Sequence, residues 1–172
     1  AGGMDNGPQV LTGDAMMGEA AALEPATYEP ADPDDPVLQL YTSGTTSNPK
    51  GVQLSNRNLF SLRKPGLAEQ MPWPNLEPDD CILMVMPCAH IGGTGSAPTG
   101  VANGIRILVQ PEFTPTGVLD AIESGATILF LVPAAIQMVV QHPQAAETDF
   151  SNLRYMLYGA APMPLELLKE AV

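Results

Sequence analysis

From Val37 onward, short apolar runs alternate with segments in which apolar residues recur at helical intervals. Runs bounded by Gly, Pro or polar residues are typical of buried strands, and the predicted strands cover residues 37–42, 81–86, 105–109, 127–132 and 153–158. The segments between them predict helices that begin near Asn56 and near Pro164 and that cover residues 91–103, 116–124 and 133–141. This alternation predicts an α/β fold, with about five strands in a mainly parallel sheet that carries helices on both faces.

Two regions depart from this rhythm. Residues 1–36 are rich in Gly, Ala, Pro and acidic residues and lack a sustained apolar period. They predict a loosely structured lead-in to a domain at residues 37–172; Leu11 and the Met16-Met17 pair could anchor a short helix there. Farther along, the Lys64-Pro65-Gly66 segment is expected to stop or kink the helix that begins near Asn56.

The net charge of the chain indicates which classes of molecule it can bind. The chain of 172 residues has a net charge of −12, and residues 1–49 carry eight acidic groups and no Lys or Arg. Such a chain repels nucleic acid and anionic lipid, and any bound ATP would need a metal ion to offset its charge. Because no apolar run approaches the roughly 20 residues that span a bilayer, and no basic segment of a signal peptide stands at the N-terminus, we expect a cytoplasmic protein without a membrane span.

The two cysteines do not form a metal-binding pattern. Cys81 and Cys88 lack the spacing of a zinc site, and both are expected to be buried free thiols. Cys88 and His90 are two residues apart, which does not align them as a nucleophile and its base on a strand or a helix.

The most informative segment follows the first predicted strand. Residues 42–50 consist mainly of hydroxyl residues and glycine with a single lysine, Lys50. A loop with this many backbone N–H groups, hydroxyls and one cation suits a polyphosphate. It is not a Walker A motif, because Gly51 follows Lys50 where that motif has Ser or Thr.

This segment resembles the phosphate-binding signature of the adenylate-forming superfamily, which includes acyl-CoA synthetases, luciferases and the adenylation domains of peptide synthetases. The family pattern is Tyr-Thr-Ser-Gly-Thr-Thr-Gly-x-Pro-Lys-Gly-Val, and residues 41–52 match it at every fixed position except Ser47. A second departure is Asn56, which stands where the family often has a histidine.

Two later loops resemble family motifs in the expected order. Residues 87–93 look like the Pro-x-x-His-x-x-Gly segment, in which the histidine, here His90, borders the carboxylate of the acyl substrate. Residues 159–162 look like the Gly-Ala-(Ala/Ser)-Pro segment, whose backbone lies against the adenine and the α-phosphate. Since ligands of open α/β sheets bind beyond the carboxyl ends of the strands, all three loops are expected to meet at one sheet edge.

The resemblance implies an AMP-forming acyl-CoA ligase that activates a carboxylic acid, such as a fatty acid, with ATP and Mg²⁺ and then passes the acyl group to coenzyme A. Catalysis would rest on positioning and charge stabilisation, with Lys50 and His90 as the catalytic residues. The residues implied to bind ATP are Thr42, Ser43, Gly44, Thr45, Thr46, Lys50, Gly159, Ala160 and Ala161. The residues implied to bind the acyl substrate are His90, Gly92 and Gly93, and Thr45 is a candidate magnesium ligand.

The resemblance covers residues 37–172, and the family's downstream motifs and its C-terminal domain are missing from this stretch. We therefore expect a partial AMP-binding domain, truncated inside its last helix, that cannot form an acyl-adenylate without the rest of the enzyme. The alternative is a flavodoxin-like module that binds a nucleotide or phosphate, or makes protein contacts, without catalysis. Replacement of Lys50 by Ala in a full-length protein separates the two classes, because only an enzyme would lose adenylation.

Overall fold

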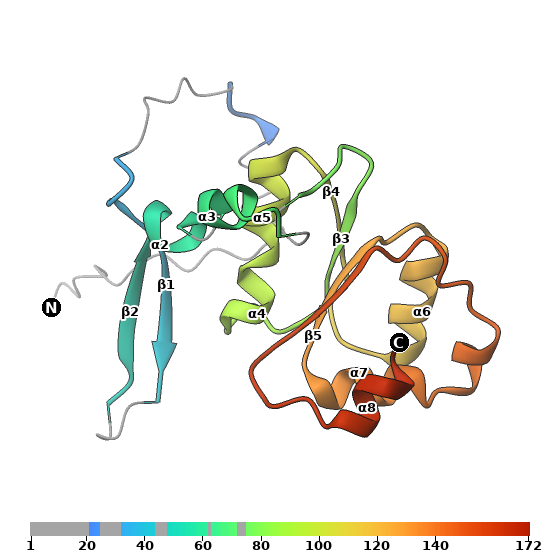
Figure 1. The fold of residues 1–172 in the computed structure, drawn as a ribbon. Helices are drawn as coiled ribbons and strands as arrows, with labels where there is room; N and C mark the ends of the chain where they lie inside the picture. Colours follow the sequence, from blue (N-terminus) through green and yellow to red (C-terminus); the bar gives the residue numbers. More distant parts are fainter. Residues whose placement is uncertain (1–20, 25–31, 44–47, 62, 72–74) are drawn as a thin grey trace, which may run out of the picture. The chain divides into compact units, whose positions relative to one another are not determined.

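The computed structural model describes residues 21–24, 32–43, 48–61, 63–71 and 75–172 (Figure 1). The chain divides into two compact units, residues 1–32 and 33–172, and every element described below belongs to the second. The short helix predicted around Leu11 and Met16 and the loop residues Gly44, Thr45, Thr46 and Ser47 lie outside the described residues.

The first predicted strand does not join the parallel sheet. Strand β1 (Pro36–Thr42) pairs antiparallel with β2 (Lys50–Ser55) in a sheet of two strands. Strand β2 was not predicted, and its pairing corrects the expectation that residues 37–42 would be followed by a loop and then a helix. The hairpin places Thr42 opposite Lys50, and its half-buried apolar residues include Leu38, Leu40 and Leu54.

The helix predicted near Asn56 is confirmed, but its break falls earlier than expected. Ser55 is the N-cap of helix α2 (Asn56–Phe60): its hydroxyl accepts from the Asn58 N–H while the Asn58 side chain accepts from the Ser55 N–H. Helix α3 (Arg63–Ala68) then runs through Lys64, Pro65 and Gly66, so the predicted break at these residues is wrong. Pro65 lies in the first turn of α3, where a missing N–H breaks no helical hydrogen bond.

The other four predicted strands form a parallel sheet, as expected. They are β3 (Cys81–Met84), β4 (Arg106–Val109), β5 (Ile128–Leu131) and β6 (Tyr155–Tyr158), in the order β4-β3-β5-β6 (Figure 1). Every neighbouring pair is parallel, with Ile82 paired to both Ile107 and Ile128. After β3 the chain forms β4 on one side of it and then crosses over to form β5 and β6 on the other side. The same strand order occurs in flavodoxin-like sheets, which bind ligands at the point where the order of the strands reverses.

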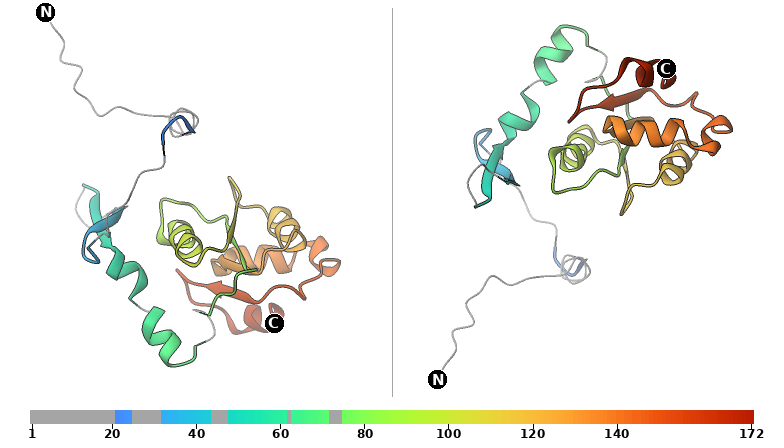
Figure 2. Two further views of the ribbon diagram at one scale, coloured as in Figure 1. Left: turned by 90° about the horizontal axis from the view of Figure 1, so that it is seen from above. Right: turned by 90° about the horizontal axis from the view of Figure 1, so that it is seen from below.

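Helices cover both faces of this sheet, as predicted. Alternate strand residues, including Leu83, Leu129 and Leu131, pack in one core with α6 (Pro115–Glu123), α7 (Pro133–Val140) and α8 (Leu165–Glu170). The opposite face, with Ile82 and Ile128, meets α5 (Ser96–Asn103). Figure 2 shows these layers from above and below. The remaining helical elements are α4 (Ile91–Thr94) and the 3₁₀ turn η1 (Pro143–Ala146), so the helix predicted over 91–103 is divided at Gly95.

A buried ionic network joins the amino ends of three strands. Asp80, just before β3, is 2% exposed and accepts hydrogen bonds from the Thr127 hydroxyl at 2.7 Å, the Glu77 N–H at 2.7 Å and the Arg154 guanidinium. Arg154 also pairs with Glu77 at 2.9 Å. Burial alone would raise the pKa of Asp80, but the hydrogen bonds from Glu77, Thr127 and Arg154 together with the charge of Arg154 hold that pKa below its ordinary value.

Candidate functional site

Two of the three predicted loops lie at the same edge of the sheet. The loop after β3 holds residues 85–90, and the loop after β6 begins at Gly159. Both leave carboxyl ends of parallel strands, and only β5 separates β3 from β6. The first predicted loop, residues 43–49, joins β1 to β2 of the separate two-stranded sheet instead, so the expectation that all three loops follow strands of one parallel sheet is wrong.

His90 occupies the start of α4. It is the N-cap residue, with an extended backbone, and its carbonyl accepts from the N–H groups of Gly93 and Thr94 and from the Thr94 hydroxyl. Its imidazole makes no capping bond and is exposed. The backbone therefore fixes the position of His90 while the ring stays accessible from the carboxyl edge.

The two glycines that follow His90 have different surroundings. Gly93 is buried, and a Cβ atom there would overlap the carbonyl oxygens of Met86 and Pro87. At Gly92 an added Cβ would lie 2.8 Å from Cε1 of Phe130, the far end of a side chain. Gly93 thus lets α4 pack on the loop after β3, whereas Gly92 faces the sheet beside Phe130.

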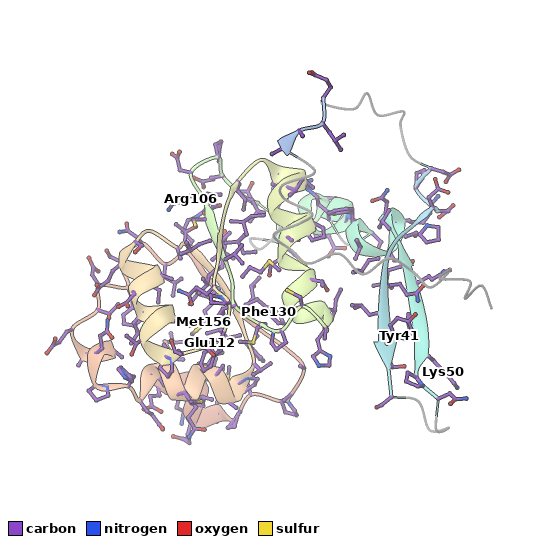
Figure 3. The ribbon with its side chains drawn as sticks, turned by 180° about the vertical axis from the view of Figure 1, so that it is seen from behind. Tyr41, Lys50, Arg106, Glu112, Phe130 and Met156 are labelled. Carbon is purple, nitrogen blue, oxygen red and sulfur yellow. The ribbon has the colours of Figure 1, made fainter. Side chains whose placement is uncertain are left out.

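Phe130 links the two loops of the carboxyl edge. It comes from β5, and its ring also lies close to Gly159, where an added Cβ would be 3.1 Å from Cζ (Figure 3). One aromatic ring therefore lies between Gly92 of the second loop and Gly159 of the third. Because neither glycine has a side chain, both backbones can approach the ring closely.

The third loop holds a residue in an unusual conformation. Ala160 has φ +67°, a left-handed conformation that costs a residue with a Cβ about 1–2 kcal/mol. Ala160 and Ala161 are exposed. Strained residues of this kind cluster at ligand-binding sites, and the small side chains leave the backbone of this loop open to a flat group.

The hairpin brings part of the predicted phosphate loop together. Thr42 and Lys50 are paired across the two strands, and both are exposed, as is Ser43. Figure 3 shows Lys50 near the tip of the hairpin. Lys50 is the first residue of β2 and not part of an open loop. Gly44, Thr45 and Thr46 lie outside the described residues, so their assigned roles stay predictions.

A cavity of about 330 Å³ opens beside Gly92. It lies against the sheet face that α5 covers, and α2 and α3 also contribute side chains to it. Its apolar wall includes Leu59, Phe60, Ile82, Ile128, Phe130 and Leu157. Ile91 and Gly92 place it next to His90, and its volume is at the lower end of the range for small-molecule sites, about 300–1,000 Å³.

The described residues were also searched for clusters that could bind a metal ion and for paired cysteines. Within the described residues, no group of three or more His, Cys, Asp or Glu side chains could hold a metal ion. Both cysteines are free; Cys81 is buried as predicted, but Cys88 is exposed, because the chain turns away from the sheet after Met86. A search of the described helices for a long apolar span that could cross a membrane finds none.

Comparison with known proteins identifies the family. The sequence model of the AMP-binding enzymes matches residues 5–172. The chain belongs to the AMP-binding enzyme family. The match begins well before Val37, so it includes most of the acidic segment from which no family motif was recognised.

Curated relatives of this AMP-binding chain are acyl ligases. It is 34% identical over 164 residues to a fatty acid–[acyl-carrier-protein] ligase of Streptomyces coeruleorubidus, covering 91% of this chain and 32% of that protein. It is 35% identical over 155 residues to a feruloyl-CoA synthase of an Amycolatopsis species, covering 86% and 30%. The chain thus spans about a third of the length of the curated relatives it matches.

Solved structures of the same family agree with the fold. ATP-bound MatB from Rhodopseudomonas palustris matches with a TM-score of 0.74 and 28% identity, over 91% of this chain and 31% of that one. The inhibitor-bound N-terminal domain of FACL13 from Mycobacterium tuberculosis matches with a TM-score of 0.73 and 29% identity, over 91% and 39%. The α/β fold with a parallel sheet is therefore that of the N-terminal domain of adenylate-forming enzymes.

Sequence reasoning missed Phe130 and the second strand of the hairpin. Residues 128–131 are uniformly apolar, so their pattern does not show which of them faces the carboxyl-edge loops. In β2, by contrast, Val52 and Leu54 alternate with Gly51 and Gln53, a period of two that favours a strand. The family signature directed attention to the phosphate loop and away from this weaker pattern.

Proposed function

We propose that this chain supplies nucleotide- and acyl-binding residues of an AMP-forming acid–thiol ligase. A substrate carboxylate oxygen attacks the α-phosphorus of ATP, the bond from that phosphorus to the bridging oxygen breaks, and pyrophosphate leaves. The acyl-adenylate then gives its acyl group to a thiol, for which coenzyme A is the first candidate, and AMP is released. The observation that carries the proposal is the meeting of Gly92 and Gly159 around Phe130, next to a cavity, in a chain of this family.

Nucleotide binding is assigned to the hairpin loop and to the loop after β6. Thr42, Ser43 and Lys50 are exposed around the tip of the hairpin, where hydroxyls and an ammonium group can reach the β- and γ-phosphates. Gly159, Ala160 and Ala161 present a backbone with little side-chain bulk to the adenine and the α-phosphate. These groups hold the triphosphate and orient it, which accounts for catalysis without a protein nucleophile.

Acyl binding is assigned to the cavity beside α5. His90 directly precedes Ile91 and Gly92, which line the cavity, so its exposed imidazole is assigned to the substrate carboxylate. The hydrocarbon part of the acid would pack on Ile128, Phe130 and Leu157. In this arrangement Gly93 shapes the turn after His90 and does not contact the substrate.

Magnesium is proposed to bind mainly through the phosphate oxygens of ATP and not through a site built entirely from protein side chains. The described residues offer no carboxylate or imidazole cluster for it, and Mg²⁺ commonly uses phosphate oxygens and water with one or two protein ligands. Thr45 is the proposed protein ligand. When bound, Mg²⁺ would reduce the negative charge on the phosphate oxygens.

An assay of acid-dependent pyrophosphate release tests the proposal. We expect release by a longer version of the protein that extends beyond Val172, with ATP, Mg²⁺ and a panel of fatty and aryl acids, and none by residues 1–172 alone. Lys50→Ala is expected to reduce release strongly, and Lys169→Ala, an exposed lysine paired with Glu166, serves as the control. Turnover by residues 1–172 would refute the incomplete-enzyme proposal, and full activity of Lys50→Ala would refute the role of Lys50.

A second candidate is a flavodoxin-like binding module without catalysis. The strand order β4-β3-β5-β6 favours it, since the same order occurs in flavodoxin-like proteins. In that case ATP or inorganic phosphate would bind, but no acid in the panel would release pyrophosphate from the longer protein.

A further inference from the structure

The reverse face of the hairpin carries side chains that bear on the phosphate site, and the following inference rests on the proposed role of Lys50. Successive side chains of a strand point to opposite faces of its sheet. The register pairs Tyr41 with Gly51, and Gln39 is two residues before Tyr41, so these three share one face. Lys50 and its partner Thr42 lie on the opposite face.

Gly51 is a glycine for a reason that its backbone does not supply. Its φ lies outside the left-handed range that favours glycine, and a glycine within a strand costs about 0.5–1 kcal/mol relative to alanine. An added Cβ would instead lie 2.7 Å from Nε2 of Gln39 and 3.4 Å from Cε1 of Tyr41. The missing side chain therefore leaves the space in which these two side chains lie.

Gln39 and Tyr41 are also joined to each other. The side-chain amide of Gln39 donates to the Tyr41 hydroxyl at 2.7 Å, and Nε2 of Gln53 on the neighbouring strand approaches Oε1 of Gln39 at 3.4 Å. Tyr41 is 64% exposed, so its position buries little apolar surface. An aromatic ring that covers a glycine of the paired strand is one of the devices that fix the register of a sheet.

This arrangement of Gln39, Tyr41 and Gly51, the Tyr41 clamp, adjoins the phosphate-binding end of the hairpin. Thr42 and Lys50 form the next pair of the ladder toward the tip, and Gly51 follows Lys50 directly. A hairpin of two strands is only marginally stable by itself, so its last pairs need side chains that hold them. We propose that Tyr41 and Gln39 are positioning residues, which keep the backbone of Lys50 in the ladder and so hold its ammonium group where the β- and γ-phosphates bind.

Direct binding of phosphate compounds to residues 1–172 tests the Tyr41 clamp without an acid substrate. The probes are ATP with Mg²⁺, inorganic tripolyphosphate with Mg²⁺, and AMP, each titrated by calorimetry. Tyr41→Ala should weaken binding of ATP and tripolyphosphate about two- to tenfold, the cost of ordering one long side chain on binding. The AMP affinity should stay unchanged, because AMP carries neither the β- nor the γ-phosphate. Tyr41→Phe, which keeps the ring over Gly51, should retain most of the wild-type affinity.

Gly51→Ala separates positioning from stability. Alanine favours the strand backbone, so the thermal midpoint should stay the same or rise. The new Cβ displaces the Gln39 amide from Tyr41, so the affinity for tripolyphosphate should nevertheless fall. Val37→Ala, which shortens an exposed apolar residue of β1 away from the tip, is the matched control and should leave all three affinities unchanged. A Gly51→Ala chain that binds tripolyphosphate as tightly as the wild type would overturn the inference.

A double substitution tests whether the Tyr41 clamp acts through Lys50. Lys50→Ala alone should weaken tripolyphosphate binding, and the addition of Tyr41→Ala should then cause no further loss. Additive losses, an equal loss of AMP and tripolyphosphate affinity in Tyr41→Ala, or failure of tripolyphosphate to bind the wild type would each overturn the inference. Pyrophosphate release by the longer protein tests adenylation separately. Phosphate binding that depends on Tyr41, without acid-dependent release, would support the inference and refute the proposed ligase.

Discussion

The two edges of the parallel sheet differ in what holds their residues in place. At the amino edge, Asp80, Thr127 and Arg154 precede three strands and are joined by charged hydrogen bonds. Arg106, at the start of β4, adds a bond of 3.0 Å to the Gly125 carbonyl. At the carboxyl edge the loops instead hold glycine, alanine and an exposed histidine. In Figure 3 Arg106 is labelled at the start of β4, and Glu112 is labelled in the loop that follows this strand.

This difference indicates that the amino edge of the sheet stabilises the fold and that the carboxyl edge binds ligands. The buried charge network holds the starts of the three strands together, and Asp80 at its centre is used in hydrogen bonds to Glu77, Thr127 and Arg154. The carboxyl edge contributes few side-chain hydrogen bonds to stability, and its backbone and His90 stay accessible. Substitutions at the amino edge should therefore reduce stability, and those at the carboxyl edge should mainly alter binding.

Asp80→Ala is expected to have the largest effect. Removal of one partner of a buried ion pair costs about 3–5 kcal/mol, because the other charge stays behind; Arg154 would then lose its buried partner. Urea unfolding of residues 1–172 measures the loss. Asp80→Asn, which keeps the shape and some hydrogen bonds, provides a second variant if Asp80→Ala does not fold.

Glu166→Gln is the matched control for this prediction. Glu166 pairs with Lys169 at 2.8 Å on an exposed helix, and such pairs contribute about 0–1 kcal/mol. A loss of under about 1 kcal/mol in Asp80→Ala as well would show that the network does not stabilise the amino edge.

Gly93→Ala should be the most damaging change at the carboxyl edge. Its Cβ would overlap two backbone oxygens, those of Met86 and Pro87, which cannot move without displacing the loop after β3. Overpacking of this kind costs about 1–3 kcal/mol. Gly92→Ala meets only the end of the Phe130 side chain and should cost less stability but alter acid binding. Equal stability losses in the two variants would contradict the distinction.

The effect of pH distinguishes the two edges in a further way. The pKa of Asp80 is lowered in the folded chain, so its contribution is present above the unfolded value of 3.8 and is lost as the pH falls through the lower folded value. The stability difference between the wild type and Asp80→Asn should therefore shrink in acid, by up to about 1.4 kcal/mol per pH unit. The difference for Gly93→Ala should stay constant. Unfolding curves from pH 7 down to about pH 2 measure both, with the change for Asp80→Asn expected below the unfolded pKa of 3.8.

The sequence predicted the parallel sheet well because its strands are buried on both faces. Continuous apolar runs such as residues 81–84 cannot pack except inside a layered α/β domain. The loops at the carboxyl edge followed from the strand ends. The cavity and Phe130 did not, because they depend on which side of β5 faces α5, and a uniformly apolar strand does not show this.

The hairpin was harder to predict for a different physical reason. The apolar residues of β1 predicted a strand, but β2 is mostly exposed and offers only Val52 and Leu54 as apolar positions, with Leu54 half-buried. Whether β1 and β2 pair depends on contacts between residues that are apart in the sequence, and the residue types of each strand alone predict such pairing poorly. The family signature located Thr42 and Lys50 without indicating that they face each other across two strands.

Ala160→Gly should have the smallest effect, and in the opposite direction. Glycine adopts φ +67° without the strain that alanine bears, a gain of about 1–2 kcal/mol, but it gives the unfolded chain more freedom, a loss of about 0.4–1 kcal/mol. We expect a net stabilisation of about 0.5–1 kcal/mol, measured by urea unfolding. Ala161→Gly, at the exposed neighbour without a positive φ, should instead lose stability. If Ala160→Gly is destabilising by as much as Ala161→Gly, the strain is not real. If Ala160→Gly stabilises the chain but raises the KM for ATP in the longer protein, Ala160 lowers stability while fixing the loop in the conformation that binds the nucleotide.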